Sequence, residues 1–245
     1  MMYSGEGIVL RRKVLREDDF LVTLLTKEYG KLSLAVRSGA KIKSKLSPPL
    51  ANAHRIEFAA VKGQEIDTLT FSAILERFGP LEASLEQRLR ALQLVEAVDR
   101  LVGDHVADRQ IYDHLSEALR VLGQTSDAVR AGKFLAHRFL WVLLHRLGTG
   151  PEVRFCVNCR KVASLSSFSV AKGGMLCASC HGMDAGAISV PPRLIPFFQL
   201  EKERDDSIAS GDLALFSRIV YEWVALHLSR PLNSFSFTDT YVSRG

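Results

Sequence analysis

Apolar and polar positions alternate over the first 75 residues, at the period of two that is typical of β-strands. Runs rich in β-branched and aromatic residues predict five short strands, over 7–15, 20–27, 31–37, 56–61 and 66–74. No convincing helical pattern lies between them. Five short strands in such a length predict a small closed or partly open barrel. The oligonucleotide-binding (OB) fold is the leading candidate, and an SH3-like barrel is the main alternative.

After residue 80 the apolar positions recur at helical spacing. Ser84 and Gln87 form a capping-box pattern, which predicts the start of a first helix. Asp108 is suited to cap a second helix that Gly123 ends, and a third helix ends near Gly148. The helical pattern then stops and resumes only near residue 194, so the segment between is predicted to be an insertion in a helical domain.

All four cysteines of the chain lie in this inserted segment. They form two pairs, Cys156 with Cys159 and Cys177 with Cys180, each with two residues between them. Zinc binds four thiolates tetrahedrally, and a turn of this spacing presents both sulfurs of a pair to one ion. The sequence therefore predicts one zinc ion held by all four cysteines in a short hairpin, a zinc ribbon.

Two other uses of the cysteines fit the sequence less well. A redox dithiol needs only one pair and usually lies on a thioredoxin-like βαβ unit, whose pattern is absent from the sequence. A catalytic zinc ion keeps an open position for water, whereas four cysteines close the coordination shell. His181, next to Cys180, is predicted to be a surface residue. We therefore expect a structural zinc ion.

Changes in composition along the chain predict four segments. They are an OB-fold nucleic-acid-binding domain over 1–79, the first part of a helical domain over 80–148, the zinc ribbon over 149–190 and the second part of the helical domain over 191–245. The fold class predicted is α+β.

The positive charge of the chain is concentrated near its start. The formal net charge is +5, and residues 1–80 hold 13 Lys and Arg against 9 Asp and Glu. Local excess positive charge favours a surface that faces a polyanion, and a solvated basic loop is the alternative. The residues predicted to bind the phosphates of DNA are Arg11, Arg12, Lys13, Arg16, Arg37, Lys41, Lys43 and Lys45.

The sequence contains no pattern that indicates catalysis. The phosphate-binding motif G-x-x-x-x-G-K-[ST] is absent, so nucleotide hydrolysis is not supported. The carboxylates Glu17, Asp18, Asp19 and Glu28 suggest a metal-dependent nuclease only weakly, because their spacing matches no metal-ligand pattern; balancing of nearby charge is the alternative. We predict a protein that is not an enzyme.

The start of the chain lacks the pattern of a signal peptide, and its most apolar helical stretch is interrupted by charged residues and is too short to span a bilayer. Cysteines confined to one cluster suit a metal site in a reducing compartment. The cytoplasm is therefore the expected location.

Taken in order, several motifs of this chain resemble those of the RecO family of bacterial recombination mediators. They are Gly7–Leu10, Glu17 with Asp18, Leu24–Thr26, Glu28 with Gly30, the basic loop around Gly39 and Ala40, the segment from Leu147 to Cys180 with its four cysteines, and Pro231–Ser234. The resemblance covers nearly the whole chain, and the cysteines are its most specific part. One departure is Ser38, which stands where a basic residue is expected, although Arg37 precedes it.

The resemblance implies an OB-fold domain, a helical domain and a zinc ribbon, without enzymatic turnover. It also implies binding to single- and double-stranded DNA and annealing of complementary strands. The partners it implies are RecR, single-strand-binding protein on the DNA and, indirectly, the RecA filament, at the nucleoid in the cytoplasm. Two further hypotheses remain beside it: a protein-binding adaptor without a direct DNA role, and the nuclease.

Overall fold

The computed structural model describes residues 1–16, 18–39, 44, 46–79, 84–125, 130–201, 208–228 and 232–235. They belong to two compact units. The first contains Met1–Ala136 and the described residues near the C-terminus, and the second lies within His137–Arg230. Helix α3 (Arg130–Arg146) runs from one unit into the other.

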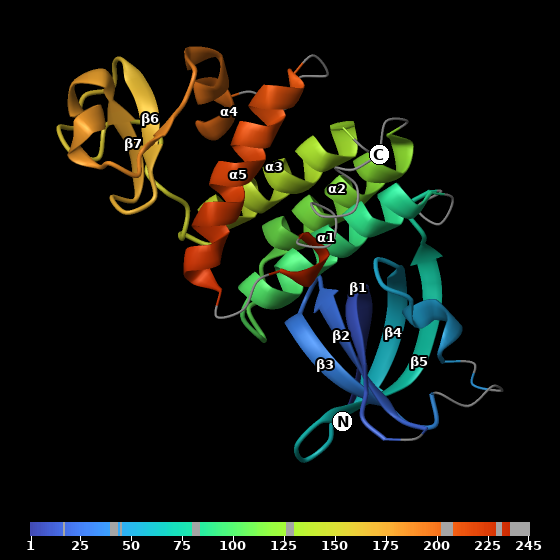
Figure 1. Ribbon diagram of the computed structural model, residues 1–245. Coiled ribbons are helices and arrows are strands. Elements are labelled where there is room, and N and C mark those ends of the chain that lie inside the picture. Colours follow the sequence, from blue (N-terminus) through green and yellow to red (C-terminus); the bar gives the residue numbers. More distant parts are fainter. Residues whose placement is uncertain are drawn as a thin grey trace. The chain divides into compact units, whose positions relative to one another are not determined.

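A closed five-stranded barrel forms the first part of the chain (Figure 1). Its strands are β1 (Met2–Val14), β2 (Phe20–Thr26), β3 (Gly30–Val36), β4 (Arg55–Val61) and β5 (Asp67–Glu76). They follow one another around the barrel in the order β1-β2-β3-β5-β4, with β3 and β5 parallel and the other pairs antiparallel. This is a Greek-key barrel of the OB type, as the alternation predicted.

Strand β1 closes the barrel because it is longer than predicted. It begins at Met2 rather than at residue 7. Its first half pairs with β4, from Met2 opposite Val61 to Ile8 opposite Arg55, and its second half pairs with β2. A bulge between Val9 and Arg11 separates the two halves, and such bulges bend a strand and increase its twist.

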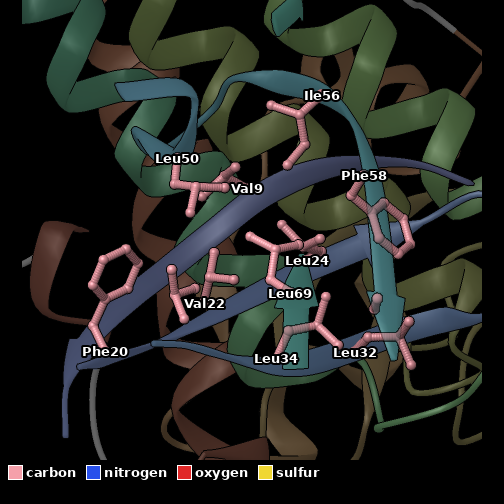
Figure 2. Close-up of a cluster of buried hydrophobic side chains, with 12 residues drawn as sticks. Val9, Phe20, Val22, Leu24, Leu32, Leu34, Leu50, Ile56, Phe58 and Leu69 are labelled. Carbon is pink, nitrogen blue, oxygen red and sulfur yellow. The ribbon is translucent and has the colours of Figure 1, made fainter. Parts of the chain in front are cut away.

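The alternate residues of all five strands fill the barrel interior (Figure 2). Apolar side chains at period two point to the same face of a strand, which is why the pattern could be read from the sequence. The buried cluster consists of Val9, Phe20, Val22, Leu24, Leu32, Leu34, Val36, Leu50, Ile56, Phe58, Ala60 and Leu69. Leu50 is contributed by the short helix η1 (Pro48–Leu50) rather than by a strand.

Two helices pack with the barrel in the first unit, α1 (Leu85–Leu101) and α2 (Arg109–Gln124). The hydroxyl of Ser84 accepts a hydrogen bond from the backbone N–H of Gln87, as the capping box predicted. The second half of the box does not form, because the Gln87 amide donates instead to the carbonyl oxygens of Leu122 and Thr125 at the end of α2. Asp108 caps α2 as predicted.

Gly123 does not end α2, contrary to the prediction. It is still helical, and the helix continues to Gln124. A Cβ atom at this position would lie 1.9 Å from the carbonyl oxygen of Phe78. Glycine is therefore required here by the close approach of another segment, rather than by a change of backbone direction.

One lysine joins the barrel to the end of α1. Lys31 in β3 is 8% exposed, and its ammonium group donates to the carbonyl oxygens of Asp99 and Val102 at 2.7 and 2.6 Å. It also forms an ion pair with Asp104 at 3.2 Å. These carbonyls have no partner within the helix, so the lysine satisfies them and complements the negative end of the helix dipole.

The second unit combines helices with a small sheet. Its elements after α3 are β6 (Leu165–Ser169), β7 (Gly174–Cys177), η2 (Ala178–Met183), β8 (Ile188–Ser189), η3 (Pro192–Leu194), α4 (Ile195–Phe198) and α5 (Ser210–His227). The sheet has the order β7-β6-β8. Across the described residues, none of the helices combines the length and apolar character needed to cross a membrane.

Candidate metal centre and basic surface of the barrel

Two backbone turns carry the four cysteines. In the first, the N–H of Cys156 donates to the carbonyl oxygen of Lys161 and the N–H of Arg160 donates to that of Cys156, both at 2.8 Å. In the second, Cys177 ends β7 opposite Leu165, and η2 carries Cys180. A bond from the N–H of Val157 to the carbonyl of Met175 at 2.9 Å ties the first turn to β7, so the backbone holds the two cysteine pairs together.

The four sulfur atoms converge on one point. All of them lie within 4.8 Å of one another, and those of Cys159 and Cys177 are 3.7 Å apart. Four sulfurs at about 2.3 Å from a tetrahedral zinc ion would be about 3.8 Å from one another. The thiol set and its spacing therefore fit a metal ion of this kind. Cys156, Cys177 and Cys180 are buried, and Cys159 is exposed.

The surroundings of Cys156 and Cys180 shift the pKa values of these two thiols in opposite directions. Burial raises the pKa of Cys156, but backbone N–H groups of Cys159, Cys177 and Asn158 outweigh it and lower the pKa overall. The amide of Asn158 donates to the sulfur of Cys180 at 3.3 Å and lowers its pKa, yet burial and the neighbouring thiols together raise it. Four thiolates this close repel one another, so a cation is needed to hold all four charged.

The cysteine hairpin is packed against the helices of its unit through one aromatic side chain. Phe168 in β6 is fully buried, and its ring lies 6.2 Å from Trp141 in α3, 6.4 Å from Phe198 in α4 and 5.9 Å from Trp223 in α5. A hairpin without this contact would depend on the metal for nearly all of its stability. Here the hydrophobic contact contributes as well, which the sequence pattern did not indicate.

Five of the eight residues predicted to bind DNA are described, and two of these lie on the second half of β1 with partners within the first unit. Arg11 forms an ion pair with Asp99 of α1 at 2.9 Å. The guanidinium group of Arg12 lies 3.7 Å from the ring centre of Phe20, over a residue of the barrel core. Lys13 is exposed next to them. Lys41, Lys43 and Lys45 lie outside the described residues.

Asp19 organises the start of the basic loop. Its carboxylate accepts hydrogen bonds from the backbone N–H of Ser38 at 2.7 Å and from the guanidinium group of Arg37 at 3.0 Å. These bonds, with the Ser38 N–H first, lower the pKa of Asp19, and the charge of Arg16 adds to the effect. Ser38 has a φ of 50°, and its N–H bond to Asp19 holds it in this uncommon backbone conformation.

The carboxylates considered for a nuclease do not form a metal site among the described residues. The cysteines are the only group of three or more His, Cys, Asp or Glu side chains there that is placed to hold one ion. The Asp19 carboxylate accepts the hydrogen bonds from Ser38 and Arg37. Glu17 lies outside the described residues. His181 is exposed, as predicted.

Sequence reasoning missed two residues of these sites. Asn158, between the first two cysteines, was not recognised as a donor to sulfur; its amide within the C-x-N-C turn was the available signal. Asp99 was missed as the partner of Arg11, and nothing in the sequence indicates a pairing between residues so far apart.

Comparisons with known proteins agree with this architecture. The family model "Recombination protein O N terminal" matches residues 1–78, and "Recombination protein O C terminal" matches residues 84–235. The chain is similar to proteins named "DNA repair protein RecO". One from Bifidobacterium longum is 28% identical over 98% of this chain and 99% of its own length.

Two further relatives carry the same name. The protein from Moorella thermoacetica is 30% identical over 74% of this chain and 67% of its own length. The protein from Exiguobacterium sp. is 30% identical over 84% of this chain and 80% of its own length. The two family models match one after the other along the chain, which also has a barrel, a helical region and a four-cysteine cluster. The chain therefore belongs to the RecO family.

Proposed function

We propose that this protein is a DNA repair and homologous recombination mediator, which binds single- and double-stranded DNA and anneals complementary strands. With RecR it would help to load RecA onto DNA coated by single-strand-binding protein. The observation that carries the proposal is a closed OB-type barrel with cationic side chains on its surface, in a chain of the RecO family. The proposal includes no enzymatic turnover, and it places the protein in the cytoplasm at the nucleoid.

The basic residues of the barrel differ in how accessible they are to a phosphate. Lys13 and Arg16 are exposed, whereas Arg11 and Arg37 are bound to Asp99 and Asp19 on one side. Paired arginines keep donors for a phosphate, but each such contact competes with the existing ion pair. We therefore expect Lys13 and Arg16 to contribute more to DNA affinity than Arg11 and Arg37. The predicted contacts of Lys41, Lys43 and Lys45 remain part of the proposal.

Annealing would follow from charge neutralisation. Lysine and arginine side chains that bind phosphates neutralise part of their charge, which lowers the repulsion between two strands held on one protein, and the release of condensed counterions favours the binding. Hydrophobic side chains fill the barrel interior, so the strands would lie on its outer surface. In this proposal the helical part serves protein partners.

We also propose that Cys156, Cys159, Cys177 and Cys180 hold one structural zinc ion. The close sulfur spacing supports this, because it suits a tetrahedral ion with no open position. When bound, the ion would supply stability to the hairpin and no reaction chemistry. The division into segments 1–79, 80–148, 149–190 and 191–245 is kept as part of this proposal.

The test measures the affinity of the full chain for a labelled single strand and a labelled duplex as salt is raised. Replacing Lys13 and Arg16 by alanine should weaken binding and flatten the slope of log affinity against log salt by about 0.7 per lost phosphate contact on a single strand. Arg109→Ala is a matched control, since Arg109 is an exposed arginine of α2 paired with Asp113. Unchanged binding in the double variant would favour the protein-binding adaptor.

The annealing step has its own experiment. Complementary strands coated with single-strand-binding protein should anneal faster with the chain than without it. Magnesium-dependent degradation of the strands would instead support the nuclease. Cys177→Ser should lower zinc content and solubility, with a smaller effect on the DNA affinity of the barrel. A Cys177→Ser variant that is folded but does not bind DNA would contradict a purely structural zinc site.

A further inference from the structure

Three exposed cations surround the first cysteine turn: Arg154, Arg160 and Lys161. The ribbon segment 149–190 contains two carboxylates, Glu152 and Asp184. Glu152 accepts the backbone N–H of Arg154, and Asp184 accepts the hydroxyl of Ser169 and the N–H of Gly186. Within the described part of the chain, none of the three cations forms an ion pair. We call Arg154–Lys161 the basic knuckle.

The backbone of Arg160 is in the left-handed region, with a φ of 64°. The turn requires this conformation, because the Arg160 N–H closes it by donating to the carbonyl of Cys156. Glycine adopts it without cost, whereas a residue with a Cβ atom is strained. Arginine at this position is therefore strained where glycine would not be, and strained residues of this kind cluster at functional sites.

The side chain of Arg160 is held in a defined orientation. Its guanidinium carbon lies 3.7 Å from the centre of the half-buried Phe155 ring. Stacking on an aromatic face leaves the N–H donors at the edge of the guanidinium plane free, in a geometry that suits two oxygens of one phosphate. The same stacking covers this face of Phe155, so the arrangement favours a phosphate rather than a base as the ligand.

From these observations we infer that the basic knuckle binds the phosphodiester backbone of nucleic acid, as a contact surface additional to the barrel. This inference rests on the proposed DNA-binding function and extends it to the second unit. Arg160 would contact a phosphate through its guanidinium edge, and Arg154 and Lys161 would add positive charge beside it.

A different role for the same cations makes a different prediction. Four thiolates around one zinc ion leave two negative charges, which nearby cations would offset. If that were their purpose, removing them would lower zinc content or thermal stability and leave DNA affinity intact. The Arg160 guanidinium group is stacked on Phe155, and among the described residues the side-chain donor to a cysteine sulfur is the amide of Asn158.

Arg160→Gly separates the two roles, because it removes the charge and also relieves the backbone. With zinc content and melting temperature retained or raised, we expect affinity for a labelled thymidine oligomer to fall about threefold to tenfold, with a flatter salt dependence. Lys161→Ala should act in the same direction without touching the strained position. Arg160→Lys keeps the charge but loses the planar guanidinium edge, so it should retain only part of the affinity.

Lys172→Ala is the matched control. Lys172 is exposed on the same ribbon, at the turn between β6 and β7 beside Asp184, and is not part of the first cysteine turn. Its removal should leave affinity nearly unchanged. A labelled duplex, measured in parallel, shows whether the knuckle prefers one form of the backbone, and a loss of affinity for either form supports the inference.

The inference is overturned if Arg160→Gly and Lys161→Ala bind both probes like the wild type, if Lys172→Ala weakens binding equally, or if the knuckle variants lose zinc. Failure of the proposed function looks different: the wild type would bind neither probe, or removal of Lys13 and Arg16 would have no effect. Weakened binding in the barrel variant beside unchanged knuckle variants would refute this inference alone.

Discussion

Replacing Phe168 by alanine should destabilise the second unit strongly, because this residue joins the cysteine hairpin to three helices. The side chain is 0% exposed and its ring packs against Trp141, Phe198 and Trp223. Truncation of a buried phenylalanine costs about 3–5 kcal/mol, and each aromatic pair adds about 0.5–1.5 kcal/mol beyond buried area. Because alanine can form none of the three aromatic pairs, we expect a decrease of about 4–5 kcal/mol in the free energy of unfolding.

Tryptophan fluorescence is a local probe of this change. The chain has two tryptophans, Trp141 and Trp223, and both pack against Phe168. In a urea titration of the zinc-supplemented protein, the fluorescence midpoint should fall by about 2 M, at a typical slope of about 2 kcal/mol per M. Val162→Ala, on the exposed surface of the same ribbon, should change the free energy of unfolding by less than about 0.5 kcal/mol and so leave the midpoint within about 0.25 M of the wild type. A Phe168→Ala midpoint within that same margin would refute the docking role.

Three more substitutions test other parts of the structure. Gly123→Ala, which would stabilise an ordinary helix interior, should instead destabilise the protein by about 2 kcal/mol in urea unfolding, because the added Cβ meets the Phe78 carbonyl; a stabilised variant would contradict this packing. Lys31→Met should cost about 3 kcal/mol because it removes two charge-assisted hydrogen bonds at the end of α1. Arg11→Met should cost less, because the Arg11 side chain is half exposed. Arg193 lowers the pKa of Asp212 below its ordinary value of 3.8, so this pair stabilises the protein above that pH and the contribution is lost as pH falls through the lowered pKa. Asp212→Asn should therefore show a smaller loss of stability than the wild type between about pH 4 and pH 2, and identical pH profiles would count against the pair.

The order of secondary structure could be predicted because it depends on local chemistry. Apolar residues at period two gave strands, helical spacing gave helices, and Ser84 and Asp108 capped α1 and α2 as expected. The cysteine spacing likewise brought four sulfurs to one place, since a two-residue gap suffices for each turn. The strands, helices and caps depend on residues close together in the sequence. The metal site depends on cysteine, a residue type that has few other roles when it occurs in pairs of this spacing.

What the sequence could not show depends on contacts between residues far apart. The residue pattern identifies a strand but not its neighbours, so β1 pairing with both β2 and β4 became visible only in the closed barrel. Gly123 was read as a helix end, and only the approach of Phe78 explains it.

The basic residues show the same division most clearly. Composition by itself determined that positive charge gathers at the start of the chain. Tertiary structure decided that Arg11 is bound to Asp99, that Arg12 stacks on Phe20, and that Arg160 is presented on a strained turn beside the cysteines. Charge is a property of each residue, whereas its availability to a ligand depends on which neighbours the fold brings to it.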